Sequence, residues 1–138
     1  MKRTISLIVI IALTFTLCCG IAEARASLYL SDYGVLLDTG SSSGELVITY
    51  SVDASKLVTS IGVSKIEIYN ENDTKVRTIT GSESNGLIRN ETCMTHNGEY
   101  SVYCTPGVSY YAKVTVFAGN STGSDSRTVT TTTEQAGT

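Results

Sequence analysis

The sequence has 138 residues, of which 41% are hydrophobic and 17% are charged, and its formal net charge is −3. A chain of this length is expected to form one domain with a modest core. The mildly acidic balance argues against nucleic acid and anionic membranes as partners, because both bind basic surfaces.

The chain begins with a segment that has the features of an export signal. Two basic residues follow the initial methionine, residues 4–22 are uncharged, and Ala22-Glu23-Ala24 places small residues where a signal peptidase cuts. We therefore expect residues 1–24 to be a signal peptide and residues 25–138 to form a single secreted domain, without membrane contact after cleavage. The alternative is an uncleaved anchor, since the 19 uncharged residues are just long enough to span a bilayer.

Beyond residue 26 the sequence is patterned as β-strands. Short runs rich in Val, Ile, Thr and Tyr are separated by clusters of Gly, Ser, Asn and Asp. In chain order, we expect strands over residues 29–37, 45–52, 65–69, 75–80, 87–92, 99–104, 110–117 and 127–133. Because no helical pattern interrupts these runs, they predict an all-β fold, an antiparallel β-sandwich of about seven strands.

The alternation of apolar and polar residues predicts which side chains face the core. The clearest inward candidates are Leu46, Ile48, Tyr50, Val52, Ile66, Ile68 and Val76. Residues 58–63 show no clear period. We expect them to form a crossover that packs Leu57 and Ile61 over one end of the sandwich.

Residues 104–116 read Cys-Thr-Pro-Gly-Val-Ser-Tyr-Tyr-Ala-Lys-Val-Thr-Val. This segment resembles the corner and following strand of fibronectin type III domains, which read Leu-x-Pro-Gly-Thr-x-Tyr-x-Val-x-Val. The resemblance implies a structural corner built by Pro106, Gly107 and Tyr110, at which the hydroxyl of Tyr110 bonds back to the backbone. The chain departs from the family pattern at Cys104, which stands where the family has a core Leu.

A second resemblance covers nearly the whole mature chain. Residues 28–33, 47–52 and 61–69 are similar to segments of small, secreted, single-domain bacterial proteins of unknown function, which have a fibronectin-like or immunoglobulin-like character. This resemblance implies the same kind of sandwich and brings no activity with it.

Two cysteines, Cys93 and Cys104, remain after the expected cleavage. An even pair in an exported chain predicts a disulfide, and Asn97-Gly98 is a typical hairpin turn that would bring the two cysteines together. Such a bridge would contribute roughly 3 kcal/mol. The alternative is a metal site of Cys93, His96 and Cys104, which lacks the fourth ligand of structural zinc, so we expect no metal and no cofactor. His96 is expected in a solvated loop.

The segment Asp38-Thr39-Gly40 resembles the active-site loop of aspartic proteases. In that family a second Asp shares a water and a proton with the first, so one loop per chain would require a homodimer. No convincing flap accompanies this loop, and Asp, Gly and Ser are also the residues of an ordinary turn. We therefore expect no enzyme and no catalytic residue, with a homodimeric protease using Asp38 as an alternative.

Two sets of residues are expected at the surface. Exposed Tyr side chains can stack on sugars or anchor a protein partner; the candidates are Tyr29, Tyr33, Tyr69, Tyr103 and Tyr111. Glycosylation sequons begin at Asn72, Asn90 and Asn120. All three sequons fall at expected loops or strand ends.

Taken as a whole, the sequence favours a non-catalytic module that binds an extracellular or cell-surface protein or glycan. The expected binding surface is formed by loops at one end of the sandwich, residues 38–44, 81–86 and 119–125, and the chain is expected to be a monomer. The alternative is a structural subunit that joins others along an exposed edge strand, and the Thr-rich run over 128–133 supports it.

Overall fold

The computed structural model describes residues 28–138, so the expected signal peptide over residues 1–24 lies outside the described residues. The strands of the described part are β1 (Leu30–Thr39), β2 (Glu45–Val58), β3 (Ser60–Asn70), β4 (Lys75–Thr80), β5 (Ile88–Arg89), β6 (Cys93–Tyr103), β7 (Ser109–Asn120), β8 (Gly123–Thr130) and β9 (Glu134–Gln135). None of these residues belongs to a helix long and apolar enough to cross a membrane.

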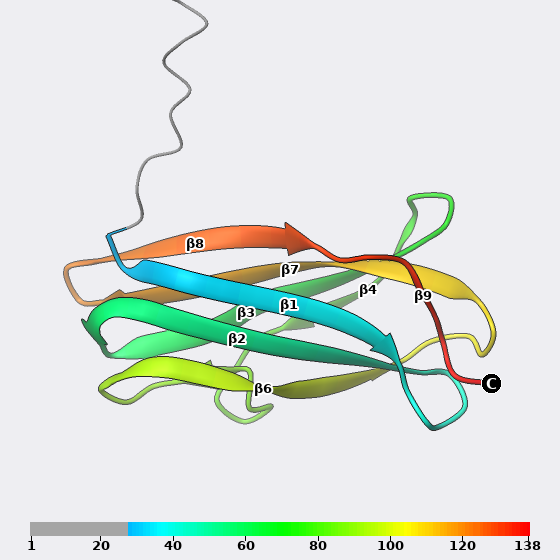
Figure 1. Cartoon of the computed structure of the whole chain (residues 1–138), viewed down its shortest axis with the longest axis horizontal. Coiled ribbons are helices and arrows are strands. Elements are labelled where there is room, and N and C mark those ends of the chain that lie inside the picture. The colour runs from blue at the N-terminus through cyan, green and yellow to red at the C-terminus, as the bar shows by residue number, and fades with distance from the viewer. Residues whose placement is uncertain (1–27) are drawn as a thin grey trace, which may run out of the picture.

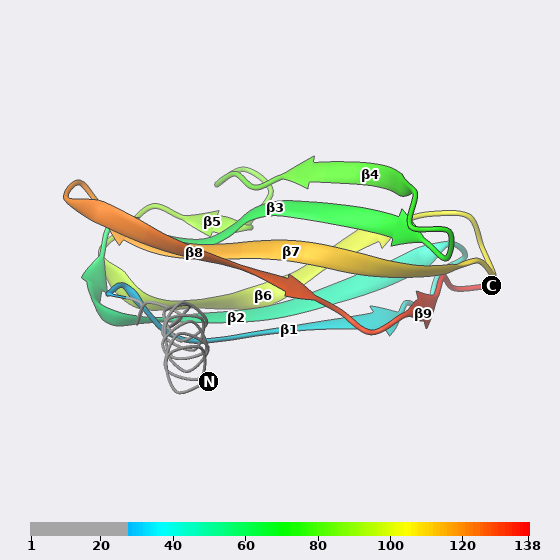
Figure 2. The ribbon, with the colours of Figure 1, turned by 90° about the horizontal axis from the view of Figure 1, so that it is seen from above.

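The strands form two antiparallel sheets that pack face to face (Figures 1 and 2). The small sheet has the strand order β1-β2-β6. The large sheet has the order β4-β3-β7-β8, with β5 beside β3 and β9 beside β7. The antiparallel β-sandwich predicted from the strand pattern is therefore confirmed.

The core lies between the two sheets and is built from alternate residues of the long strands. The buried members predicted from the sequence are Leu46, Ile48, Tyr50, Val52, Ile66 and Ile68, none of them more than 3% exposed. In β7, buried Ala112, Val114 and Val116 alternate with half-buried residues. The residues between the buried ones therefore point to the outer faces.

Two residues expected in the core lie at the surface instead. Val76 is 44% exposed and Leu57 is 62% exposed, whereas Ile61 is buried as expected. The register of β4 on β3 shifts at Tyr69, and that of β6 on β2 shifts around Leu57. At both places the irregularity breaks the strict alternation on which the prediction depended.

Several strand boundaries differ from the expected ones. The crossover expected over 58–63 is not a separate segment, because β2 continues to Val58 and β3 begins at Ser60. The strand expected over 87–92 is reduced to β5. The strand expected over 127–133 ends at Thr130, although the N–H of Thr131 still donates to the carbonyl of Ala112, and β9 then pairs with the start of β7.

The two cysteines are free thiols at opposite ends of β6. Cys93 pairs with Val58, whereas the backbone N–H of Cys104 donates to the carbonyl of Gly44 over 2.8 Å. At about 3.3 Å per residue, β6 separates the two cysteines by roughly 35 Å, and a disulfide requires Cα atoms within about 7 Å. The predicted disulfide between Cys93 and Cys104 is therefore wrong for this fold, and Asn97-Gly98 lies inside the strand rather than in a turn.

His96 lies in β6 rather than in a solvated loop, and its side chain is half-buried. Its Nε2 is 2.8 Å from the carbonyl oxygen of Gly86 and 3.3 Å from the hydroxyl of Tyr50. The Tyr50 hydroxyl donates to the same carbonyl over 2.9 Å. The two side chains therefore fasten the segment that precedes Leu87, whose side chain is buried in the core.

The corner before β7 is held by Tyr110. Its side chain is 5% exposed, and its hydroxyl accepts a hydrogen bond from the backbone N–H of Thr105 over 3.2 Å. Gly107, which follows the exposed Pro106, has a φ of 75°, a conformation that favours glycine. Its N–H donates to the carbonyl of Ala136, so the corner is tied to the C-terminal segment.

Candidate functional site

Polar and aromatic side chains gather on the outer face of the large sheet. On β3 and β7, these outward residues alternate with the buried aliphatic residues of the core. We name the following set the outer-face cluster: Lys65, Glu67 and Tyr69 of β3, Lys75 of β4, and Tyr111 and Lys113 of β7. The pairing of β3 with β7 places Tyr69 opposite Tyr111 and Glu67 opposite Lys113.

The two tyrosines of the cluster stack on one another. Their ring centroids are 5.3 Å apart and their planes differ by 10°. The hydroxyl of Tyr69 donates to Glu67 over 3.0 Å, and the hydroxyl of Tyr111 donates to Asp73 over 2.8 Å. These hydrogen bonds to carboxylates raise the pKa of both tyrosines. Because stacking and hydrogen bonding fix both rings in advance, a partner would lose little entropy in ordering them.

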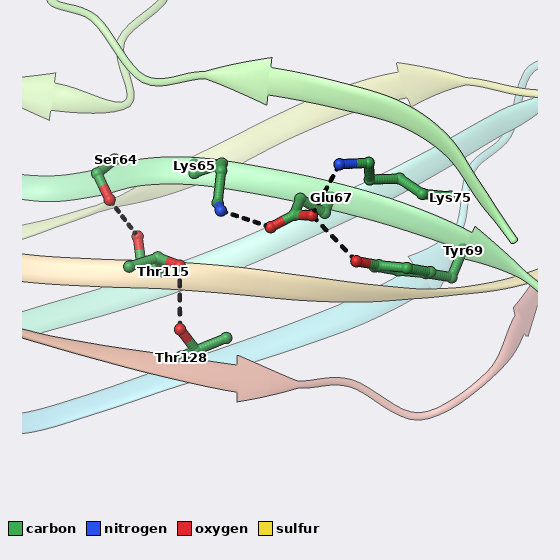
Figure 3. Close-up of polar contacts among 7 residues, drawn as sticks. All are labelled: Ser64, Lys65, Glu67, Tyr69, Lys75, Thr115 and Thr128. Carbon is green, nitrogen blue, oxygen red and sulfur yellow. Dashed lines mark hydrogen bonds and ion pairs between the residues drawn. The ribbon is translucent and has the colours of Figure 1, made fainter. Parts of the chain in front are cut away.

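Glu67 lies between two cations (Figure 3). Nζ of Lys65 is 2.6 Å from its Oε1, and Nζ of Lys75 is 3.3 Å from its Oε2. The hydrogen bonds from Lys65 and then from Tyr69 lower the pKa of Glu67 to about 2. The side chain of Glu67 is 14% exposed, whereas those of Lys65 and Lys75 are 48% and 49% exposed. The cluster therefore presents ammonium groups, rather than the carboxylate, to solvent.

Lys113 brings a third cation to the cluster. Its Nζ lies 4.9 Å from the centroid of the Tyr69 ring, within the range of a cation–π contact. Counting Asp73, which accepts the hydroxyl of Tyr111, three lysines against two carboxylates leave the cluster and its hydrogen-bond partner with a charge of +1, on a chain whose net charge is −3. Positive charge is therefore concentrated on one face of an acidic protein.

The outer face of the small sheet has the opposite sign. Neither β1 nor β6 contains Lys or Arg, and the single cation of β2, Lys56, lies over the ring of Tyr29. The carboxylates on these three strands are Asp32, Asp38, Glu45, Asp53 and Glu99. An anionic partner would be repelled from the small sheet and attracted to the large one.

The ion pairs of Glu67 predict a loss of stability in acid. The pKa of Glu67 is near its ordinary value of 4.5 when the chain is unfolded and is lowered to about 2 in the folded protein. The stabilisation is therefore fully present above pH 4.5 and disappears as the pH falls toward 2. We expect the free energy of unfolding, measured by urea denaturation from pH 6 down to pH 2, to fall less steeply in Glu67→Gln than in the unmodified protein.

Glu99→Gln is the control for this measurement, because it removes an exposed carboxylate on the small sheet and leaves the ion pairs of Glu67 intact. We expect it to retain the steep acid limb. Equal slopes for Glu67→Gln and the unmodified protein would contradict the assigned role of Glu67.

The loops expected to form one binding surface lie in different places. The loop over 40–44, which joins β1 to β2, lies at the end of the sandwich that holds the C-terminus (Figure 1). The turn over 121–122, which joins β7 to β8, lies at the opposite end (Figure 1). The segment over 81–86 lies beside β3, where the N–H of Gly81 donates to the carbonyl of Ser64 over 2.8 Å. The prediction of a single loop surface at one end is therefore wrong.

The tyrosines named from the sequence fall into three groups. Tyr33 and Tyr103 are exposed, and Tyr69 and Tyr111 are half-buried within the outer-face cluster. Tyr29 is only 9% exposed, so its expected surface position is wrong. It packs in the core, and its hydroxyl lies 3.1 Å from that of Thr122. Only two of the five tyrosines therefore come together on one face.

The remaining candidate residues are dispersed. Asp38 is exposed and lies within β1, opposite Val47, rather than in the turn expected from its sequence. Among residues 28–138, no group of three His, Cys, Asp or Glu side chains is placed to hold a metal ion. The sequon residue Asn72 lies in the turn between β3 and β4, Asn120 ends β7, and Asn90 follows β5.

No protein-family model matches this chain, and no curated protein matches it either. Sequence reasoning named the two tyrosines of the outer-face cluster but missed its charged members. The signal for them was present as Lys-x-Glu-x-Tyr over 65–69 and Tyr-x-Lys over 111–113, which occupy the positions between the inward-facing residues.

Proposed function

We propose that this protein is a secreted, non-catalytic β-sandwich module that binds an extracellular protein or glycan through the outer-face cluster. The observation that carries the proposal is the stacked pair of Tyr69 and Tyr111 on the outer sheet face, with Lys113 over the Tyr69 ring and Lys65 and Lys75 paired with the neighbouring Glu67. Pre-ordered aromatic rings supply contact area, and the lysines favour a partner that bears carboxylates or other anionic groups. This surface replaces the loops as the proposed binding site.

Secretion is supported by the N-terminal sequence. A basic start, an uncharged stretch and an Ala-x-Ala site are the three parts of a signal peptide, and removal of residues 1–24 would release the domain outside the cell. An intact mass that begins at residue 25 would support this part of the proposal. A mass that includes residues 1–24 would contradict it.

We also propose that the sandwich is of the fibronectin type III-like or immunoglobulin-like kind. Two observations support this: the hydrogen bond at the corner between Tyr110 and Thr105, and the sorting of the strands into antiparallel sheets that share one core. Such folds act as scaffolds, and their function depends on the side chains of one surface. This is consistent with a binding role for the outer-face cluster.

The binding proposal is tested on arrays of extracellular proteins and glycans that include acidic members. We expect signals from acidic members, and we expect the double variant Tyr69→Ala/Tyr111→Ala to bind the strongest of them at least about 30-fold more weakly, as is typical of a lost aromatic anchor. Tyr33→Ala/Tyr103→Ala is the matched control, because it removes two exposed tyrosines from the small sheet. Absence of any specific signal, or equal losses in both variants, would contradict the proposal.

A further inference from the structure

The outer edge of β6 has no partner strand among residues 28–138. β6 ends the small sheet and pairs only with β2 (Figure 1). Its sequence contains no Pro, Lys or Arg, and its ladder with β2 runs from Thr95 to Tyr103 without a bulge. The β6 side chains that stand opposite buried residues of β2, and so point inward, include no carboxylate. The usual features that prevent pairing at a strand edge are therefore missing from β6.

Two hydrogen bonds at the end of β6 show which backbone groups face this edge. The N–H of Cys104 donates to the carbonyl of Gly44, so it points toward β2. The carbonyl oxygen of Tyr103 accepts Nη1 of Arg77 over 2.7 Å, so it points away from β2. Because this direction alternates along a strand, every second residue of β6 turns its N–H and carbonyl to the open edge. These residues include Asn97, Glu99 and Ser101.

The small sheet has no strand that faces β4. The large sheet extends to β4, whereas β6, the last strand of the small sheet on that side, lies against β3. Arg77 and Ile79 of β4 stand opposite two buried isoleucines of β3, so their side chains point to the inner side. Arg77 is nevertheless exposed and Ile79 is only half-buried. The inner face of β4 is therefore left uncovered.

A hollow of about 480 Å³ lies between β4 and the end of β6. Its lining residues are Val76, Arg77, Cys104, Thr105, Pro106 and Tyr110. In the described part of the chain Arg77 forms no ion pair, and its hydrogen bond to Tyr103 uses one of five N–H donors. A guanidinium can bind both oxygens of one carboxylate. The hollow therefore favours a partner that brings a carboxylate together with apolar groups.

We propose that β6 accepts an extended segment of another protein as an added antiparallel strand, with an acidic side chain at Arg77. Opposite residues of a ladder share a face, so partner residues opposite Val102 and Tyr100 point inward. β4 and β6 run in opposite directions (Figure 2), so the first of these residues meets Arg77 and the second lies toward Ile79. The partner segment therefore reads acidic-x-apolar, with a polar x on the outer face.

The charge at the hollow favours such a segment over β6 of a second copy. In a symmetric pair of β6 strands, the inward side chains of the second copy would be those of His96, Gly98, Tyr100 and Val102. None of them is a carboxylate, so Arg77 would remain without a counter-ion. The inference does not depend on the outer-face cluster, which lies on the other face of the large sheet.

A synthetic peptide tests the proposal, and the probe is Thr-Glu-Thr-Val-Thr-Val-Thr with blocked ends. We expect it to slow hydrogen exchange of the amides of Asn97, Glu99 and Ser101, because the added ladder uses these N–H groups. The matched peptide with Gln in place of Glu should bind about tenfold more weakly. Arg77→Gln should bind the two peptides equally. Unchanged exchange along β6 at millimolar peptide, or equal affinity of the unmodified protein for both peptides, would overturn the proposal.

Alkylation of the two cysteines by iodoacetamide gives a second readout within the same chain. Cys104 lines the hollow, whereas Cys93 lies at the opposite end of β6. We expect the Glu peptide to slow the reaction of Cys104 and to leave that of Cys93 unchanged. Tyr69→Ala/Tyr111→Ala should retain this difference, so failure of the outer-face cluster as a binding site would not affect the result. An unchanged rate at Cys104, or equal slowing at both cysteines, would contradict binding at the hollow.

Discussion

Leu46→Ala should lower the free energy of unfolding by about 3 kcal/mol, whereas Leu57→Ala should lower it by less than about 0.5 kcal/mol. Both leucines belong to β2, but Leu46 is fully buried between the sheets and Leu57 is 62% exposed. Truncation of Leu46 removes apolar contacts and leaves a cavity that neighbours such as Ile48 and Val102 can fill only in part. Urea denaturation of the three proteins measures both changes.

The comparison is matched, since residue type, strand and substitution are the same at both positions. The pair of variants distinguishes the observed fold, in which Leu57 is exposed, from the sequence-based expectation that Leu57 packs over one end of the sandwich. Similar losses at Leu46 and Leu57 would contradict the assigned faces of β2.

Gly62→Ala should cost about 2–3 kcal/mol of stability, because two effects act at that position. Gly62 has a φ of 142°, a conformation that side chains disfavour, and an added Cβ would lie 2.0 Å from the carbonyl oxygen of Leu87. That oxygen accepts the N–H of Val63 over 2.8 Å, so the backbone cannot move aside without losing this bond. The same urea titration measures the loss.

Gly34→Ala is the matched control, because an added Cβ at Gly34 would meet nothing within 4 Å. We expect it to change stability by less than about 0.5 kcal/mol. A neutral Gly62→Ala would show that the segment carrying Leu87 does not lie against β3, and the close approach of β5 to β3 would then be wrong.

Strand alternation was the most reliable part of the sequence prediction. In β2 and β3 the period of two separates buried aliphatic residues from outward polar ones, and this separation is a local property that a sequence shows directly. The prediction failed at Val76 and Leu57 because register shifts reset the alternation there. Such shifts depend on the partner strand, which local patterning does not reveal.

The disulfide prediction failed for a related reason. Asn97-Gly98 is a strong local turn signal, but β2 is long enough to pair with both residues, with Ser51 opposite Asn97 and Tyr50 opposite Gly98. An added Cβ at Gly98 would lie 2.9 Å from the hydroxyl oxygen of Tyr50. Glycine is therefore favoured at position 98 because the side chain of Tyr50 lies against it. This long-range contact outweighs the local preference of Asn97-Gly98 for a turn.

The end of the sandwich at which each loop lies also depends on long-range pairing. In an up-and-down chain, successive connections alternate between the two ends. Here β4 and β5 both pair antiparallel with β3, one after the other, so the chain runs in the same direction through both. Every later connection therefore lies at the end opposite to the one it would have in an up-and-down chain. As a result, the turn between β7 and β8 lies away from the loop between β1 and β2 (Figure 1).

The proposed binding through the outer face of the large sheet can be tested by mapping amide chemical shifts during titration with the strongest array ligand. We predict that the largest changes fall on residues 65–69 of β3 and 111–115 of β7, with smaller changes on β4. Changes concentrated at residues 40–44, 81–86 or 121–122, with β3 and β7 unaffected, would contradict the claim.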